Sequence, residues 1–214
     1  MSQIVVVLGA TGMVGSALVE LLLADTRVSE IRILSRRPLS YSQSKIKVFE
    51  TDLYNPNALA FDQATALYCC IGTTRKKTPN RDTYHSIDHG ITLAVATAAK
   101  AAGLSEVHLI SAIGADSRSK IFYNRLKGEI ENDLNSLNFE RTMIYQPALL
   151  IGNRNEKRAG EKFAQWISPF LDKLLNEKVM KYHSIKAQQL AAGMLKYSFL
   201  SGHHQKKLTY SELI

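Results

Sequence analysis

Cysteine is almost absent from this sequence, which has only Cys69 and Cys70 among 214 residues. Neighbouring cysteines cannot form an ordinary disulfide, and both lie in the apolar run of residues 66–71, so we expect small buried side chains in a reducing compartment. This excludes a disulfide-stabilised secreted domain and favours a cytoplasmic protein. His85 and His89 are four residues apart, but no third ligand is evident, so we expect no metal site.

An uninterrupted apolar run that could cross a membrane is also missing. Residues 4–24 are mostly apolar and have roughly the length of a spanning helix. However, Gly9, Gly12 and Gly15 interrupt the stretch, and Glu20 lies inside it. It has neither the basic start nor the cleavage site of a signal peptide. A strand, a turn and a helix explain it better, and we expect no membrane contact.

Long blocks of like charge are missing as well, and the longest basic run is Arg75–Lys77. The 27 basic and 19 acidic side chains give a net charge of +8. A positive potential steers phosphate-bearing ligands toward a protein, although solubility alone would also explain it. Because the sequence has no recognisable nucleic-acid module and no interleaved aromatic residues, we expect no nucleic-acid partner.

Apolar runs alternate with segments of helical periodicity as far as Pro147. Six short apolar runs, most of them rich in β-branched residues, predict strands, and three of the segments between them predict helices. Strands separated by helices or short crossovers form βαβ units, so the sequence predicts an α/β fold with a doubly wound parallel sheet. Strands are expected at residues 4–8, 31–34, 46–49, 66–71, 107–110 and 142–145, and helices at 13–22, 81–102 and 122–137.

The alternation weakens after Pro147. There we expect a loop at 148–160, helices at 161–175 and 184–200, and a last strand at 207–210. No linker separates these residues from the rest, and the length fits one large domain with a small appendage. The sequence therefore predicts a single domain over residues 1–214, in which 148–214 is a small, mainly helical extension on the substrate side.

A glycine-rich turn, Gly9-x-x-Gly12-x-x-Gly15, joins the first predicted strand to the first predicted helix. Gly9 permits a tight turn, Gly12 lets the backbone approach a pyrophosphate, and Gly15 lets the helix pack close to the sheet. The helix N-terminus offers free N–H groups and partial positive charge to phosphates. The turn predicts a dinucleotide site, against the alternative that the glycines serve turning and packing alone. Its cofactor-binding residues are Gly9, Thr11, Gly12, Met13, Val14 and Gly15.

The end of the second predicted strand decides between NAD and NADP. An NAD-specific site places a carboxylate there, whereas this chain has Ser35-Arg36-Arg37-Pro38. A guanidinium binds a 2′-phosphate through two parallel hydrogen bonds, so we expect NADP(H), with Arg36 as the first choice and Arg37 as the second. The alternative is a pair of solvent-exposed arginines in a turn.

Two more strand ends lie at the edge of the sheet where such folds bind ligands. Asp52, followed by Leu53, ends the third predicted strand and could accept a hydrogen bond from an adenine amino group. The backbone after the fourth strand and one threonine side chain could line the cofactor groove. Those residues are Cys70, Ile71, Gly72 and Thr73.

A candidate catalytic group follows the fifth predicted strand. Ser111 ends that strand, and Tyr123 and Lys127 lie four residues apart on the next helix, so they share a face. Reduction of a carbonyl leaves negative charge on its oxygen, and Tyr123 could supply the proton while Lys127 favours the phenolate. Lys127 could also bind the ribose hydroxyls of the cofactor, so Tyr123 and Lys127 are expected among the cofactor-binding residues too. Ser111 could orient the substrate oxygen. The alternative is a helix-face tyrosine beside a solvated lysine.

In the order of the glycine turn, Ser111 and Tyr123-x-x-x-Lys127, the chain resembles the short-chain dehydrogenase/reductase superfamily. More closely, it is similar to the atypical branch typified by the Tat-interacting protein and its bacterial relatives. The resemblance implies a Rossmann fold, NADP(H) binding, a Ser–Tyr–Lys site, and Pro147 against the nicotinamide. It is carried by residues 34–38, 70–75, 111–116, 123–131 and 146–152.

The function expected on these grounds is an NADPH-dependent oxidoreductase that reduces a small carbonyl compound by hydride transfer. Members of the branch are also described as regulators, so a non-catalytic NADP(H)-binding protein is the alternative. The expected partner is the small-molecule carbonyl substrate, and the chain is expected to be a monomer or a homodimer.

Overall fold

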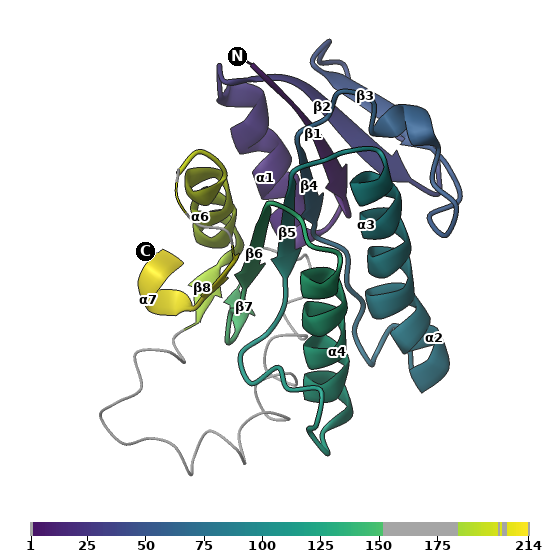
Figure 1. Ribbon diagram of the computed structural model, residues 1–214, viewed down its shortest axis with the longest axis vertical. Coiled ribbons are helices and arrows are strands. Elements are labelled where there is room, and N and C mark those ends of the chain that lie inside the picture. Colours follow the sequence, from purple (N-terminus) through teal and green to yellow (C-terminus); the bar gives the residue numbers. More distant parts are fainter. Residues whose placement is uncertain (1, 152–183, 201, 203–204, 214) are drawn as a thin grey trace.

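The computed structural model describes residues 2–151, 184–200, 202 and 205–213 (Figure 1). Seven parallel strands form one sheet in the order β3-β2-β1-β4-β5-β6-β9. This order confirms the predicted doubly wound, Rossmann-like α/β sheet, because the chain builds one half outward from β1 and the other from β4. The strands are β1 (Gln3–Leu8), β2 (Val28–Ser35), β3 (Ile46–Glu50), β4 (Ala66–Cys69), β5 (Glu106–Ile110), β6 (Arg141–Tyr145) and β9 (Gln205–Leu208).

Helices cover both faces of the sheet, with α1 and α6 on one side and α3 and α4 on the other (Figure 1). In β1, Val5 and Val7 pack in the α1 layer, whereas Val6 and Leu8 pack in the α3 layer. All four are essentially inaccessible to solvent, which explains why the strand is apolar throughout. The helices are α1 (Met13–Ala24), α2 (Arg81–His85), α3 (Thr92–Ala101), α4 (Phe122–Ser136), α6 (Ala187–Ser198) and α7 (Tyr210–Leu213), with a 3₁₀ turn at Ala58–Ala60.

The helix predicted at 81–102 is not a continuous α-helix. Between α2 and α3 the residues Ser86–Ile91 form a π-helical stretch, which we call the π segment. A π turn widens the helix locally and often marks a functional site. Apolar periodicity is nearly the same in both kinds of helix, so the sequence could not distinguish them.

Part of the extension after Pro147 joins the main sheet. The helix predicted at 184–200 is α6, and the last predicted strand is β9, which begins at Gln205 and pairs in parallel with β6. Strand β9 therefore extends the sheet beyond the six strands of the repeated βαβ pattern.

The loop predicted at 148–160 is wrong at its beginning. There β7 (Leu150–Ile151) pairs in parallel with β8 (Ile185–Lys186) to form a separate two-stranded sheet. Strands of two residues are too short for an alternating pattern to reveal. The rest of that predicted loop and the helix predicted at 161–175 lie outside the described residues.

The apolar stretch at 4–24 is a strand, a turn and a helix, as predicted. Among the helices in the described part of the chain, none combines the length and the apolar character that a membrane crossing requires.

Candidate functional site

The glycine turn lies between the two halves of the sheet, where the carboxyl ends of β1 and β4 meet. Gly9 has a φ of +87°, and a Cβ there would lie 2.6 Å from the Cys70 carbonyl carbon. A Cβ on Gly15 would lie 2.2 Å from the Gly9 carbonyl oxygen. The fold itself therefore requires glycine at both positions. A Cβ on Gly12 would approach the same oxygen at 3.3 Å, so the chain constrains this position much less.

The first turn of α1 is open to an anion. Gly12 is its N-cap, has no side chain to accept from the first N–H groups, and is followed by no acidic residue in that turn. Thr11 is exposed, Met13 is half-buried and Val14 is buried, so Val14 can offer a ligand only its backbone N–H. Unpaired N–H groups at the positive end of a helix dipole suit a pyrophosphate.

The two arginines after β2 lie beside this turn. Leu34 pairs with Leu8 in the sheet, so the residues that follow the two strands are neighbours. Arg36 and Arg37 are both exposed, and the Arg37 N–H donates to Ser35 Oγ at 3.2 Å. Neither guanidinium forms an ion pair with any residue that the structure describes. Both are therefore available to an anionic group next to the glycine turn.

The segment just after β3 contributes the exposed carboxylate that the sequence predicted. Asp52 is exposed, and its Oδ1 accepts from the Tyr54 N–H at 3.0 Å. Leu53 is buried and packs in the core on the α3 side, so its side chain is directed away from a cofactor. A ligand at this edge can meet only the Leu53 backbone.

Strand β4 ends at Cys69, two residues before its predicted end, at the point where its pairing with β1 also ends. The Cys70 N–H still donates to the Leu8 carbonyl at 2.8 Å. Cys70 and Ile71 are half-buried and Gly72 is exposed, so this backbone forms part of the edge beside the turn.

A buried carboxylate that the sequence analysis missed lies beneath this edge. Asp88, in the π segment, is 3 % exposed. Its Oδ1 accepts from the Thr73 N–H at 2.7 Å, and its Oδ2 lies 3.1 Å from Lys127 Nζ. The Thr73 carbonyl in turn accepts from the Tyr84 hydroxyl at 3.0 Å. Asp88 therefore joins the segment after β4 to α4.

Tyr123 and Lys127 share one face of α4, as predicted. The Lys127 Nζ lies 5.9 Å from the centre of the Tyr123 ring. Lys127 is only 5 % exposed, whereas Tyr123 is half-buried. The Tyr123 hydroxyl has no hydrogen-bond partner within the described ranges.

Burial, the Lys127 ammonium and the Asp88 carboxylate together set the protonation of Tyr123 and Lys127. Burial raises the pKa of the Tyr123 phenol, the Lys127 ammonium lowers it, and Asp88 raises it, so the pKa lies above its usual value. Burial lowers the pKa of Lys127, but Asp88, helped by Tyr123 and Glu131, outweighs burial and leaves that pKa raised. Near neutral pH the site therefore holds a neutral phenol beside an ammonium.

Ser111 is buried directly after β5, but its hydroxyl is already engaged. Ser111 Oγ donates to Oε1 of Glu131, a carboxylate that is 1 % exposed. The same oxygen accepts from Gln146 Nε2 at 2.8 Å, and Oε2 lies 2.7 Å from Lys207 Nζ. A serine has one hydroxyl proton, so Ser111 can donate to a substrate oxygen only by leaving Glu131.

Pro147 is buried after β6 and lies against the Ser111 segment. The Ser111 N–H donates to the Tyr145 carbonyl at 2.8 Å, and the Ile113 N–H donates to the Pro147 carbonyl at 3.1 Å. These bonds bring the predicted nicotinamide-side residue beside the predicted catalytic serine.

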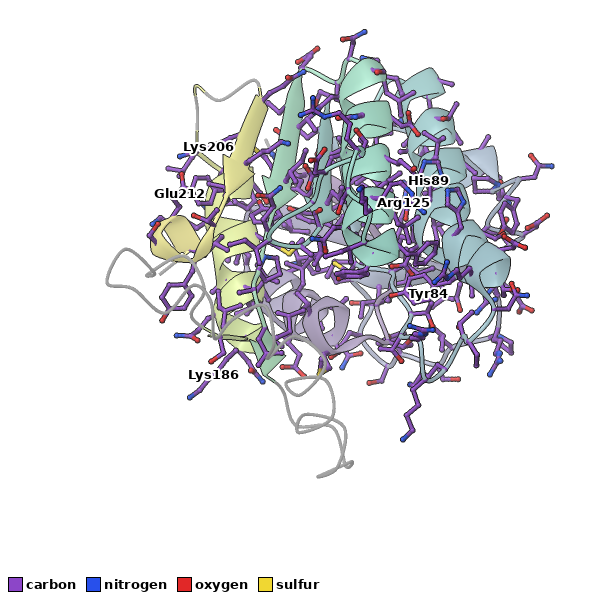
Figure 2. The ribbon with its side chains drawn as sticks, turned by 90° about the horizontal axis from the view of Figure 1, so that it is seen from below. Tyr84, His89, Arg125, Lys186, Lys206 and Glu212 are labelled. Carbon is purple, nitrogen blue, oxygen red and sulfur yellow. The ribbon has the colours of Figure 1, made fainter. Side chains whose placement is uncertain are left out.

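The two histidines pair with acidic residues of α4. His89 Nε2 lies 2.7 Å from Asp133 Oδ2, and His85 Nε2 lies 3.5 Å from Glu129 Oε2. Figure 2 shows the labelled His89 on the helix beside α4, with Tyr84 nearer the lower end of the view. Within the described ranges, no group of three His, Cys, Asp or Glu side chains could hold a metal ion.

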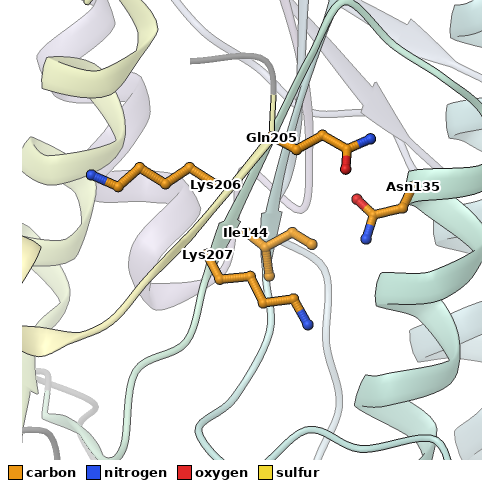
Figure 3. A pocket seen from close by; sticks show the side chains of 5 residues that line it. All are labelled: Asn135, Ile144, Gln205, Lys206 and Lys207. Carbon is orange, nitrogen blue, oxygen red and sulfur yellow. The ribbon is translucent and has the colours of Figure 1, made fainter.

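A small pocket lies between α4 and β9, apart from the predicted site residues (Figure 3). Its volume is about 210 Å³, and it contains none of the predicted site residues. Lys207, which lines this pocket, forms an ion pair with the buried Glu131. Its lining residues are Asn135, Ile144, Gln205, Lys206 and Lys207.

Helical spacing could have revealed one of the missed carboxylates. Glu131 lies four residues after Lys127, which itself lies four after Tyr123, so all three share a face. Asp88 carried a weaker signal, because the helix predicted at 81–102 contains a second acid, Asp82, and nothing in its spacing singles out Asp88. Its partners come from segments far away in sequence.

Comparisons with known proteins agree with this geometry. Residues 9–162 match the model of a family described as NAD(P)H-binding. The mitochondrial protein fmp52 of Aspergillus clavatus is 34 % identical over 178 residues, which are 79 % of this chain and 76 % of that protein. The mitochondrial protein FMP52 of Eremothecium gossypii is 33 % identical over 172 residues, covering 79 % and 75 %.

Solved structures with the same fold include two nucleotide-sugar epimerases. A UDP-N-acetylglucosamine 4-epimerase from Methanobrevibacter ruminantium M1 has a TM-score of 0.72 at 13 % identity, covering 97 % of this chain and 76 % of that one. A UDP-glucuronic acid 4-epimerase from Bacillus cereus, solved with NAD, has a TM-score of 0.72 at 13 % identity, covering 97 % and 77 %. At such low identity these likenesses show the fold alone.

The comparisons correct the expected location and support the expected family only in its broader form. The predicted cytoplasmic location is wrong by this comparison, since these relatives, 33–34 % identical over most of the chain, are named mitochondrial proteins. Two free cysteines do not specify one compartment. The narrower Tat-interacting branch is not confirmed. The glycine turn, the open helix terminus and the match over residues 9–162 together establish that the chain belongs to the NAD(P)H-binding family.

Proposed function

We propose that this chain is an NADP(H)-dependent oxidoreductase that reduces a small carbonyl compound at a Ser111–Tyr123–Lys127 site. One observation carries the proposal. A tyrosine hydroxyl without a partner among the described residues shares a helix face with a buried ammonium. A structural tyrosine at a half-buried position more often has its hydroxyl bonded.

The chemistry follows from the charge that develops on the substrate. NADPH, when bound, would supply a hydride, and hydride addition to a carbonyl carbon leaves negative charge on the oxygen. Tyr123 donates its proton to that oxygen, and the Lys127 ammonium stabilises the phenolate that remains. Gly12, at the open end of α1, gives the pyrophosphate close access to the backbone N–H groups.

NADP(H) is proposed over NAD(H) because of the groups after β2. Arg36 and Arg37 are exposed cations beside the glycine turn, and an acid stands at neither position. A guanidinium matches the geometry of a 2′-phosphate. Exposed Asp52 at the neighbouring strand end is proposed to accept from the adenine amino group.

A second candidate is a non-catalytic NADP(H)-binding protein whose occupancy controls a protein contact. The engaged Ser111 hydroxyl favours it, because a serine that donates to Glu131 does not donate to a substrate oxygen. Both candidates use the same cofactor residues and differ only in turnover.

A screen of aldehydes and ketones that follows the loss of NADPH absorbance distinguishes the two candidates. With any substrate that the parent chain reduces, we expect Tyr123→Phe to lose about 100-fold or more of kcat, because the proton donor is removed. The variant should bind NADPH as the parent does, measured by calorimetric titration. Full turnover by Tyr123→Phe would show that Tyr123 is not the acid, and the absence of turnover across the screen would favour the second candidate.

A further inference from the structure

The buried Asp88 carboxylate takes no part in the chemistry described so far. It is 3 % exposed and has two partners from opposite sides, the Thr73 N–H at 2.7 Å and the Lys127 ammonium at 3.1 Å. A buried carboxylate is costly unless it is paired and hydrogen-bonded, so these contacts fix its position. They hold it directly beside Lys127, the residue that is proposed to act on Tyr123.

The backbone around Asp88 holds its carboxylate under the segment that follows β4. Asp88 belongs to the π segment, where the helix widens between α2 and α3. A Cβ on Gly72 would lie 3.6 Å from Asp88 Oδ2, so the carboxylate lies directly under the Gly72–Thr73 backbone. The Thr92 hydroxyl donates to the Asp88 carbonyl at 2.7 Å, within the same stretch. Backbone and side chain of Asp88 are thus both held.

The charges around Tyr123 come from three elements. On α4 itself, Lys127 faces the ring, and Glu131 acts on Lys127 from the next turn. The π segment contributes Asp88, and α2 contributes the buried phenol of Tyr84. The Lys127 ammonium therefore faces two carboxylates, Asp88 and Glu131, as well as the Tyr123 phenol. An ammonium that is paired with a carboxylate at 3.1 Å stabilises a neighbouring phenolate less than an unpaired ammonium does.

We propose that Asp88 is a positioning residue that holds the Lys127 ammonium and limits the stabilisation that this ammonium gives to a Tyr123 phenolate. This inference rests on the proposed function, because it concerns the proton that Tyr123 is proposed to donate. The contact of 3.1 Å fixes the ammonium against a carboxylate as well as beside the phenol. Asp88 also contributes directly to the raised pKa of Tyr123.

The test is the titration of Tyr123 in the full chain without cofactor. Tyrosine labelled with ¹³C at Cζ is followed by NMR across alkaline pH, and Tyr123→Phe identifies the signal. Asp88→Asn removes the charge and keeps an acceptor for the Thr73 N–H. We expect the Tyr123 titration to move to lower pH by about one unit, because the ammonium is no longer shared with a carboxylate.

Asp133→Asn is the matched control. Asp133 lies on α4 and, like Asp88, pairs with a basic side chain, His89, but it is 46 % exposed and has no recorded contact with Lys127. This variant should leave the Tyr123 titration unchanged. An unchanged or higher Tyr123 pKa in Asp88→Asn, or an equal fall in Asp133→Asn, would overturn the proposal. Asp88→Ser, which leaves room for water beside Lys127, repeats the test where the asparagine variant does not fold.

Turnover gives a second readout that separates this proposal from the proposed function. With a reducible carbonyl, the parent rate should fall as pH rises through the Tyr123 pKa, and Asp88→Asn should show that fall at lower pH. If no substrate is turned over, the proposed function fails while the NMR titration still decides the role of Asp88.

Discussion

Three glycines in one turn have different roles at the residue scale. The clashes predicted for a Cβ at Gly9 and Gly15 involve backbone atoms that cannot move aside, so the fold demands these two glycines. Gly12 has a φ of −77° and ψ of 168°, a conformation open to any residue. Its glycine is best explained by the approach of a ligand.

Alanine at Gly12 and at Gly15 should therefore produce different defects. We expect Gly15→Ala to lower the free energy of unfolding by about 2 kcal/mol or more, since its Cβ would overlap the Gly9 carbonyl. Gly12→Ala should cost about 1 kcal/mol or less and weaken NADPH binding at least about tenfold. Urea unfolding and calorimetric titration measure the two effects. A Gly12→Ala chain that binds NADPH like the parent would contradict the assigned role.

The sequence predicted site residues whose role depends on a local conformation. The glycine turn and the spacing of Tyr123 and Lys127 are properties of one strand–turn–helix or one helix face, so they could be recognised directly. The partners of Asp88 and the bond from Ser111 to Glu131 depend on how separate elements pack. Neither follows from spacing along the chain.

At the scale of elements, a side chain distant in sequence completes the end of α1. Lys45 Nζ donates to the carbonyls of Leu22, Leu23 and Asp25 at 2.6, 3.0 and 2.7 Å. The last carbonyls of a helix have no partner within it and carry partial negative charge, so an ammonium satisfies both needs. Lys45 thereby ties the segment before β3 to the helix that carries the glycine turn.

Removal of this cap should be measurable. We expect Lys45→Met to lower the free energy of unfolding by about 1–3 kcal/mol, because partly buried carbonyls lose a charged donor. Lys47→Met is the control, since Lys47 is 58 % exposed and, among the described residues, forms an ion pair with Glu30 alone. Its cost should stay below about 1 kcal/mol. Equal losses in urea unfolding would show that Lys45 acts only as a surface charge.

The elements that the sequence predicted correctly have strong periodicity over several residues. Strands β1, β2 and β5 are short buried runs, and α4 repeats its apolar residues through Leu126, Ile130 and Leu134. The π segment and the pair β7–β8 were missed because each is defined by hydrogen-bond register rather than by composition. Register depends on contacts that the sequence pattern does not contain.

At the scale of the whole molecule, the proposed cofactor site joins the two halves of the sheet. The turn after β1 lies between the end of β2, with its arginines, and the end of β4, with the segment held by Asp88. A dinucleotide bound there would contact both halves at once. Such a ligand binds only the folded chain, so its binding free energy adds to the stability of the whole sheet.

Thermal unfolding should therefore report which dinucleotide fits. At NADPH concentrations of about 100 times Kd, the stabilisation is about 2.7 kcal/mol, which for a chain of this size raises Tm by roughly 5–10 °C. NADH at the same concentration should raise it less, because it lacks the 2′-phosphate that Arg36 is proposed to bind. Arg36→Ala should reduce the NADPH shift to the NADH value. Arg118→Ala, which removes an exposed guanidinium near Asp116, should preserve the difference. Equal shifts for both dinucleotides in the parent chain would reject the choice of NADP(H) while leaving the dinucleotide site itself intact.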